Sequence, residues 1–195
     1  MTQITIPAIA DDGSLYPIEK LRAHELGVLH LAISVFVFSP QGELLIQRRA
    51  EEKYHCGGLW ANTCCSHPHW QEDIAACADR RMHEELGISL PMKPIGEVTY
   101  RADVGGGLIE HERVQMFKGT ADPETWIPKP NPEEIAELQW VSMDWLVEAI
   151  DADSETFTPW FRLYVQRWRN VWAPAAQPIN ATHRLMMKSR PFFHL

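Results

Sequence analysis

A cysteine and a histidine stand two positions apart, at Cys65 and His67, in the segment Trp60–Pro68. On an extended chain, side chains at positions i and i+2 point to the same side. That spacing puts a thiol and an imidazole, two groups that can carry chemistry, on one face. The same pair also fits a buried cysteine beside a structural histidine, because a free cysteine is often only a small core residue.

Two carboxylates have the same spacing at Glu110 and Glu112, inside an otherwise apolar strand pattern. Aligned anions repel each other unless a cation lies between them. With His24, His30 and His67 they make a set of three nitrogen and two oxygen ligands. Such a set suits Zn²⁺, Mn²⁺ or Mg²⁺ at five or six coordination. A solvated strand face and unrelated histidines fit the same residues, because spacing alone does not bring four segments together.

The segment 66–87 resembles a Nudix box, Gly-x5-Glu-x7-Arg-Glu-aliphatic-x-Glu-Glu-x-Gly, with two departures. Ser66 replaces the first glycine, and Arg81 replaces the glutamate after the arginine. Arg81 and Glu85 share a helix face at i, i+4. They fit an ordinary surface ion pair. They also fit a cation for a diphosphate next to a carboxylate that holds a diphosphate-bound Mg²⁺.

The charge balance limits the partners that the chain can bind. The 18 Lys and Arg against 26 Asp and Glu give a net charge of −8, which argues against nucleic acid and anionic membranes. An anionic substrate must therefore be held by a few local cations. Lys20, four residues before His24, and Arg48, Arg49 and Lys53, before Trp60–Pro68, are placed to form such a clamp; each also fits a solvated surface charge.

Length and composition indicate one globular domain. The chain has 195 residues, 45 % apolar and 23 % charged, which is the size and balance of a single folded unit. Two of its four cysteines are adjacent, and no secretory signal or 18-residue apolar run is present. These features predict reduced thiols, a cytoplasmic protein and no membrane span.

The elements that must position these residues can be expected from hydrophobic periodicity. A buried strand is predicted over 30–38, with 44–48 as its hairpin partner. Helices are predicted over 72–86, 145–150 and from Thr158-Pro159 to about residue 171, and strands around 95–102, 109–118 and 137–141. This mixed order predicts a layered α+β fold over 1–172, followed by a tail of uncertain order at 173–195.

The whole pattern resembles type I isopentenyl-diphosphate Δ-isomerase, a family on a modified Nudix fold. The resemblance rests on LHLAISVFVF (29–38), LWANTCCSHP (59–68) and TYRADVGGGLIEHE (99–112), and spans about residues 15–172. It implies an α/β/α fold with a mixed sheet. It also implies interconversion of isopentenyl and dimethylallyl diphosphate, in which protonation and deprotonation move the double bond by a 1,3 proton shift.

Carried over by position, the resemblance implies a role for each candidate residue. Cys65 is the catalytic thiol on one face of the substrate, and Glu112 works on the opposite face with Tyr100 beside it. A divalent ion (Mn²⁺, Mg²⁺ or Zn²⁺) is bound by His24, His30, His67, Glu110 and Glu112.

The resemblance further implies a second ion and a substrate clamp. Glu85 and the backbone near Cys65 help to bind a Mg²⁺ that bridges the diphosphate. The residues implied to contact the substrate are Lys20, Arg49, Lys53, Arg81 and Trp160. The expected partner is thus a small allylic or homoallylic diphosphate, and the protein is expected to be a monomer or a weak homodimer.

Two other functions fit part of the pattern. A Nudix diphosphohydrolase shares the helix and the Mg²⁺ requirement, but Arg81 stands where hydrolases carry glutamate, and hydrolysis gives no use to Cys65 or Trp160. A non-catalytic metal-binding module has no need for both Cys65 and Glu112.

Overall fold

The computed structural model describes residues 4–174 and 193–194. Its strands are β1 (Thr5–Ile9), β2 (Leu15–Glu19), β3 (His30–Phe38), β4 (Leu44–Arg49), β5 (Trp60–Ala61), β6 (Cys64–Ser66), β7 (Met92–Gly105), β8 (Leu108–Thr120), β9 (Ile135–Val141) and β10 (Phe193–His194). Its helices are α1 (Lys20–Leu26), α2 (Ile74–Leu86), α3 (Met143–Ala152), α4 (Pro159–Arg167) and α5 (Arg169–Trp172), with a short 3₁₀ turn at Ser154–Thr156.

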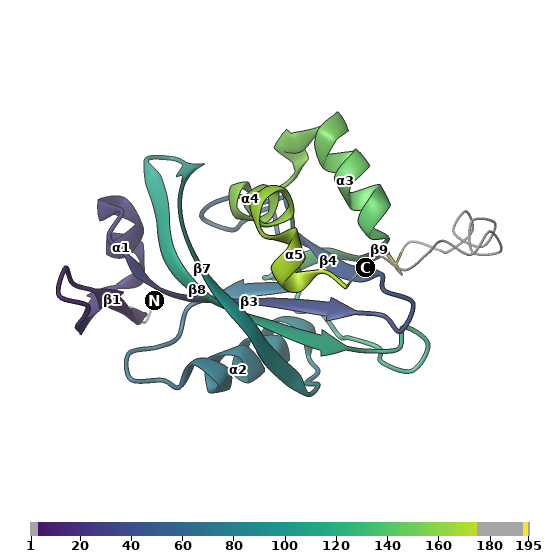
Figure 1. Cartoon of the computed structure of the whole chain (residues 1–195), viewed down its shortest axis with the longest axis horizontal. Coiled ribbons are helices and arrows are strands. Elements are labelled where there is room, and N and C mark those ends of the chain that lie inside the picture. The colour runs from purple at the N-terminus through teal and green to yellow at the C-terminus, as the bar shows by residue number, and fades with distance from the viewer. Residues whose placement is uncertain (1–3, 175–192, 195) are drawn as a thin grey trace.

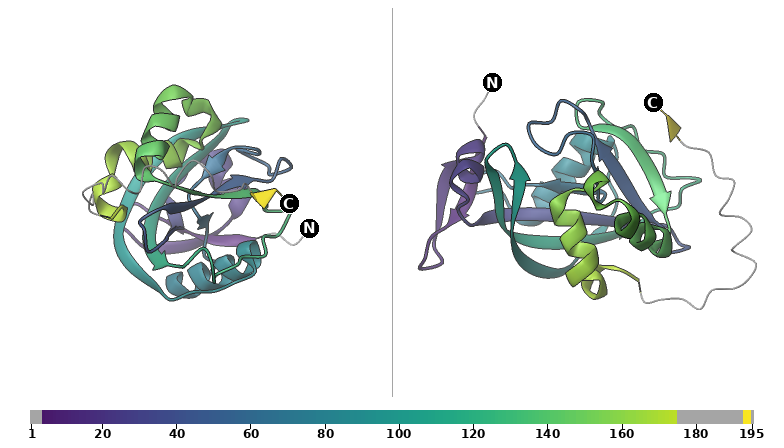
Figure 2. Two further views of the ribbon diagram at one scale, coloured as in Figure 1. Left: turned by 90° about the vertical axis from the view of Figure 1, so that its right-hand side faces the viewer. Right: turned by 90° about the horizontal axis from the view of Figure 1, so that it is seen from above.

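The strands form one mixed sheet with helices on both sides. α2 covers one face, and α3, α4 and α5 cover the other, as Figure 1 shows, while the β1–β2 hairpin and α1 lie at one end (Figures 1 and 2). Side chains of β3 alternate between the two faces: Phe36 packs toward α4, and Val35 and Val37 pack toward α2. This alternation gives two apolar cores and confirms the expected layered α/β/α arrangement.

The prediction that β3 and β4 pair as a hairpin is wrong except next to the turn. The two strands pair only at Phe38 and Leu44, and β4 pairs along its length with β9 instead. The segment 60–66 fills the opening, because β5 pairs with β4 and β6 pairs with β3. Polar side chains replace part of the missing ladder: the Thr63 hydroxyl donates to the Leu45 carbonyl and accepts from the Val37 amide. The segment that carries Cys65 is thereby fixed inside the sheet.

The register of β3 with its other neighbours brings distant positions together. β3 and β8 run parallel with His30 beside Glu112, and β7 and β8 run antiparallel with Tyr100 beside Glu112. β6 places Cys65 beside Ser34 on β3. Because neighbouring strands lie about 4.8 Å apart, these pairs share one region of the sheet face that α4 covers.

Helix ends follow local chemistry, and one predicted helix is broken in two. Asp73 caps α2 by accepting from the amides of Ala75 and Ala76, and Gly87 ends it with a φ of 66°. The helix expected from Pro159 to about 171 is instead two helices that break at Trp168, whose φ and ψ of −127° and 17° are not helical.

The short helix α1 was not expected from the sequence, since only seven residues form it. Glu19 caps it, and its side chain accepts from the amides of Leu21 and Arg22. Among the described residues, none of the helices is long and apolar enough to cross a membrane. The expected tail at 173–195 falls outside the described residues except for 173, 174 and the two residues of β10, which pairs with β9.

Candidate functional site

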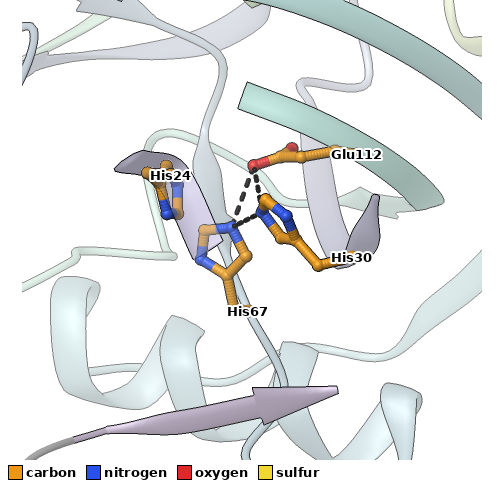
Figure 3. Close-up of side chains that lie close together, drawn as sticks. All are labelled: His24, His30, His67 and Glu112. Carbon is orange, nitrogen blue, oxygen red and sulfur yellow. Dashed lines mark hydrogen bonds and ion pairs between the residues drawn. The ribbon is translucent and has the colours of Figure 1, made fainter. Parts of the chain in front are cut away.

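Three imidazoles and one carboxylate converge at the end of β3 next to α1. The ligand atoms of this histidine–glutamate cluster all lie within 4.8 Å of one another, and its members are His24, His30, His67 and Glu112. Figure 3 shows the four side chains pointing toward one another, with dashed lines joining His30, His67 and Glu112. The His67 Nε2 atom lies 2.9 Å from Glu112 Oε1 and 3.2 Å from His30 Nε2. Separations of this size are those of neighbouring ligands around one ion with bonds of about 2.1 Å.

Backbone carbonyls select which ring nitrogens face the centre. His24 Nδ1 lies 2.7 Å from the Lys20 carbonyl, and His30 Nδ1 lies 2.8 Å from the Val28 carbonyl. A carbonyl only accepts, so each Nδ1 carries the hydrogen and each Nε2 is left with a lone pair. His24 Nε2 is buried and has no hydrogen-bond partner among the described residues. A buried, unpaired nitrogen beside two other imidazoles and a carboxylate fits a divalent cation.

Glu110 lies beside this cluster rather than inside it. Its ligand atoms group with those of His24 and His55, again within 4.8 Å. His55 Nε2 is 3.0 Å from Glu110 Oε1, and the Tyr100 hydroxyl lies 2.8 Å from both Glu110 Oε2 and Glu112 Oε2. The five residues expected to bind one ion are therefore close together, with His24 common to both groups and Tyr100 joining the two carboxylates.

The two carboxylates have opposite electrostatic surroundings. Burial, reinforced by the neighbouring Glu112, raises the pKa of Glu110 well above its ordinary value. Burial also opposes ionisation of Glu112, but the neighbouring imidazoles of His30 and His67, with the hydrogen bond from His67 Nε2, outweigh it and hold the pKa of Glu112 well below its ordinary value. The two carboxylates that the Tyr100 hydroxyl joins therefore bind a proton with unequal strength, Glu110 more tightly than Glu112.

Cys65 lies on β6, which flanks β3 on the edge opposite β8, and belongs to a chain of hydrogen bonds. Its thiol donates to Asn62 Oδ1 at 2.9 Å and lies 3.3 Å from the Ser34 hydroxyl, which is 3.0 Å from the Tyr164 hydroxyl. Asn62 is fixed as an acceptor because its amide nitrogen donates to the carbonyls of Val35 and Cys64. Burial raises the pKa of Cys65 to about 12, so the thiol is protonated at neutral pH.

One cavity connects these groups. Its walls include all three residues expected to be catalytic (Cys65, Tyr100 and Glu112) and all five expected to contact substrate (Lys20, Arg49, Lys53, Arg81 and Trp160). The Arg49 guanidinium lies over the Trp160 ring at 5.3 Å from its centre. Lys20 is half-buried, and its partial burial first, then the charges of Lys53, Arg81 and Arg49, lower its pKa to about 8.

Arg81 and Lys53 already have carboxylate partners. Arg81 contacts Glu85 at 2.6 Å, Glu84 at 2.7 Å and Glu134 at 3.2 Å. Lys53 contacts Glu134 at 2.5 Å. Lys20 and Arg49 have no ion pair within the part of the chain that the structure describes, so these two cations have the most capacity left for an anion.

The cavity residues that were not predicted from the sequence include His55 and Glu134. His55 lies in a polar loop, where its position near the basic residues Arg49 and Lys53 was the signal that could have indicated it. Glu134 follows a proline-rich stretch and carried no motif. Cys64 is fully buried toward α2, whereas Cys65 and His67 both face the cavity, as the two-residue spacing of that pair predicted.

Comparison with protein families identifies the fold and the relatives. Residues 28–161 match the NUDIX domain family. A protein of Rhodobacter capsulatus named isopentenyl-diphosphate Delta-isomerase is 49 % identical over 182 residues, covering 93 % of this chain and 100 % of the relative. One of Cereibacter sphaeroides with the same name is 52 % identical over 155 residues, covering 79 % and 86 %.

Solved structures agree on the fold alone. DR0079 of Deinococcus radiodurans superimposes with a TM-score of 0.68 at 15 % identity, over 86 % of this chain and 99 % of that chain. A MutT protein of Methanosarcina mazei gives a TM-score of 0.58 at 19 % identity, over 73 % and 94 %.

Proposed function

This chain belongs to the NUDIX domain family and, within it, to the isopentenyl-diphosphate Delta-isomerases, and we propose that Cys65 and Glu112 perform its proton transfers. The reaction converts isopentenyl diphosphate to dimethylallyl diphosphate and back. The observation that supports the assignment most directly is that a half-buried thiol and a buried carboxylate–tyrosine pair face one cavity that is also lined by four cations. Hydrolysis of a diphosphate has no use for that thiol.

The proton balance needs two groups. A proton added to the terminal CH₂ of isopentenyl diphosphate makes a tertiary carbocation, and loss of a proton from the carbon next to the CH₂–O group leaves the double bond of the product. One of Cys65 and Glu112 gives the first proton and the other takes the second; the reverse reaction exchanges their roles. Two groups on different walls make this possible without turning the substrate.

The surrounding residues support each half of this exchange. Asn62 accepts a hydrogen bond from the Cys65 thiol, and the Ser34 hydroxyl can donate a hydrogen bond to the sulfur once the thiol proton has left. The Tyr100 hydroxyl can donate its hydrogen bond to either Glu110 or Glu112. Trp160 offers a buried ring face to a cationic carbon, worth about 1–2 kcal/mol when water is excluded.

Two divalent ions fit the donor sets of the cavity. His24, His30, His67 and Glu112, with Glu110 beside them, would hold one, which when bound would stabilise the negative charge of the carboxylates. Glu85 would help to hold a diphosphate-bound Mg²⁺, and Lys20 and Arg49 would contact the diphosphate oxygens. We also propose a cytoplasmic location, since all four cysteines are free thiols.

The test is incubation with isopentenyl diphosphate and Mg²⁺ in D₂O. We expect dimethylallyl diphosphate with deuterium in a methyl group, detected by mass spectrometry and NMR. Release of inorganic phosphate without isomer formation would instead identify a hydrolase, and the proposed roles of Cys65 and Glu112 would be wrong.

A further inference from the structure

His55 is a buried histidine at the cavity that the proton transfers do not use. It lies in the loop between β4 and β5, and its side chain is only 7 % exposed. Its ring packs against Tyr54, with ring centres 4.4 Å apart, and stands 5.9 Å from the Trp160 ring. A buried imidazole held on two sides has a fixed orientation, so its hydrogen bonds have a defined direction.

The hydrogen bond of His55 to Glu110 has one possible direction when Glu110 is ionised. A carboxylate only accepts, so His55 Nε2 carries the hydrogen and donates to Glu110 Oε1 across 3.0 Å. Its Nδ1 then has only a lone pair, and this atom is buried without a partner among the described residues. Burial, and then the positive charge of Arg49, lower the pKa of the His55 ring and disfavour a second proton on it. Toward an ionised Glu110, His55 is therefore a neutral donor aimed at one carboxylate oxygen.

Glu110 needs such a donor because of where it lies. It shares the Tyr100 hydroxyl with Glu112, and like charges this close repel. The Tyr100 hydroxyl has one hydrogen and can donate to only one of the two carboxylates at a time. Within the described part of the chain, the contact with His55 is thus the one that restrains Glu110 whenever Tyr100 donates to Glu112.

We propose that His55 is a positioning residue that orients Glu110 toward a divalent ion bound by the histidine–glutamate cluster of His24, His30, His67 and Glu112. Hydrogen-bonded partners of this kind fix the direction of a metal-binding carboxylate, and their loss typically weakens metal binding by about 10–100-fold. The inference rests on the proposed function only in taking this cluster as the metal site; it does not depend on which reaction the enzyme catalyses.

The test measures metal affinity, not turnover. The dissociation constant for Mn²⁺ is determined by competition with a chelator for the wild type, His55→Gln and His55→Phe. The amide nitrogen of Gln can donate as the His55 Nε2 does, whereas Phe keeps the ring packing and cannot donate. We expect His55→Phe to bind Mn²⁺ about 10–100-fold more weakly and His55→Gln to stay close to the wild type. His83→Phe is the matched control, because His83 is an exposed histidine on α2.

A double-variant cycle separates orientation of Glu110 from general packing. In a Glu110→Ala background, His55→Phe should cause no further loss of Mn²⁺ affinity, because the oxygen that His55 holds is absent. Wild-type affinity in His55→Phe, or an equal loss with and without Glu110, would overturn the proposal. Thermal melting of the metal-free variants confirms that each is folded. If the Mn²⁺ affinities change as expected but the protein does not isomerise isopentenyl diphosphate, only the proposed function is wrong.

Discussion

Alanine at Cys65 and alanine at Cys64 should separate chemistry from packing, because these adjacent thiols lie on opposite sides of the sheet. Cys64 is fully buried in the core that faces α2. Cys65 lines the cavity and donates to Asn62. The two variants remove the same atom from neighbouring positions, so each is the control for the other.

The expected magnitudes follow from these positions. Cys65→Ala removes one of two proton-transfer groups, which should lower kcat by about 10²–10⁴-fold, or about 3–5 kcal/mol of barrier. Cys64→Ala removes one sulfur from a packed core, which should cost roughly 1 kcal/mol of unfolding free energy and leave kcat within a few-fold of the wild type. Cys65→Ser keeps a donor for Asn62 but offers a much weaker acid, so it should also be severely impaired.

The assay is kcat for isopentenyl diphosphate, together with bound metal by elemental analysis and the free energy of unfolding in urea. Bound metal should be unchanged in all three variants, because neither thiol belongs to the histidine–glutamate cluster. An inactive Cys64→Ala beside a normal Cys65→Ala would refute the strand register and the proposed catalytic role of Cys65 with it.

Three more predictions test the charges around the cavity. Burial lowers the pKa of Lys20 to about 8, so the side chain is charged below that pH. KM should therefore rise roughly tenfold as pH increases through 8, because the charge that binds the diphosphate is lost. The Lys20→Met variant should lack this step in a pH–KM profile. Burial lowers the pKa of His24 and of His67, so these ligands stay neutral below pH 6.5, the ordinary pKa of histidine. Bound metal, measured after dialysis, should therefore be retained below pH 6.5. A chelator that removes the metal should abolish turnover. Arg81→Glu puts a carboxylate among three others and should raise KM and cost about 3 kcal/mol of unfolding free energy in urea.

Patterns within one segment were enough to predict local faces. The two-residue spacings of Cys65 with His67 and of Glu110 with Glu112 depend only on strand geometry, and both pairs face the cavity. The end of α2 at Gly87 was likewise expected, because a glycine adopts the left-handed conformation there. Only the resemblance to a known family predicted which distant segments form one site.

Contacts between segments could not be predicted from spacing. The parallel register that sets His30 beside Glu112 joins positions 82 residues apart and depends on the packing of the whole sheet. The opening between β3 and β4 depends on β5 and β6, which are too short to have a periodic signal. Glu134 reaches Lys53 and Arg81 only because β9 pairs with β4.

The position of β3 between β6 and β8 explains how two reactive groups share a cavity without touching. Cys65 is beside Ser34 and Glu112 is beside His30, four residues apart on the same strand. At about 3.3 Å per residue and about 4.8 Å per strand, the two backbones are separated by roughly 13 Å along β3 and 10 Å across it. Side chains that lean inward from such positions leave room for a short carbon chain between them. A 1,3 proton shift needs this spacing, because a thiol and a carboxylate in direct contact would exchange a proton with each other rather than with the substrate.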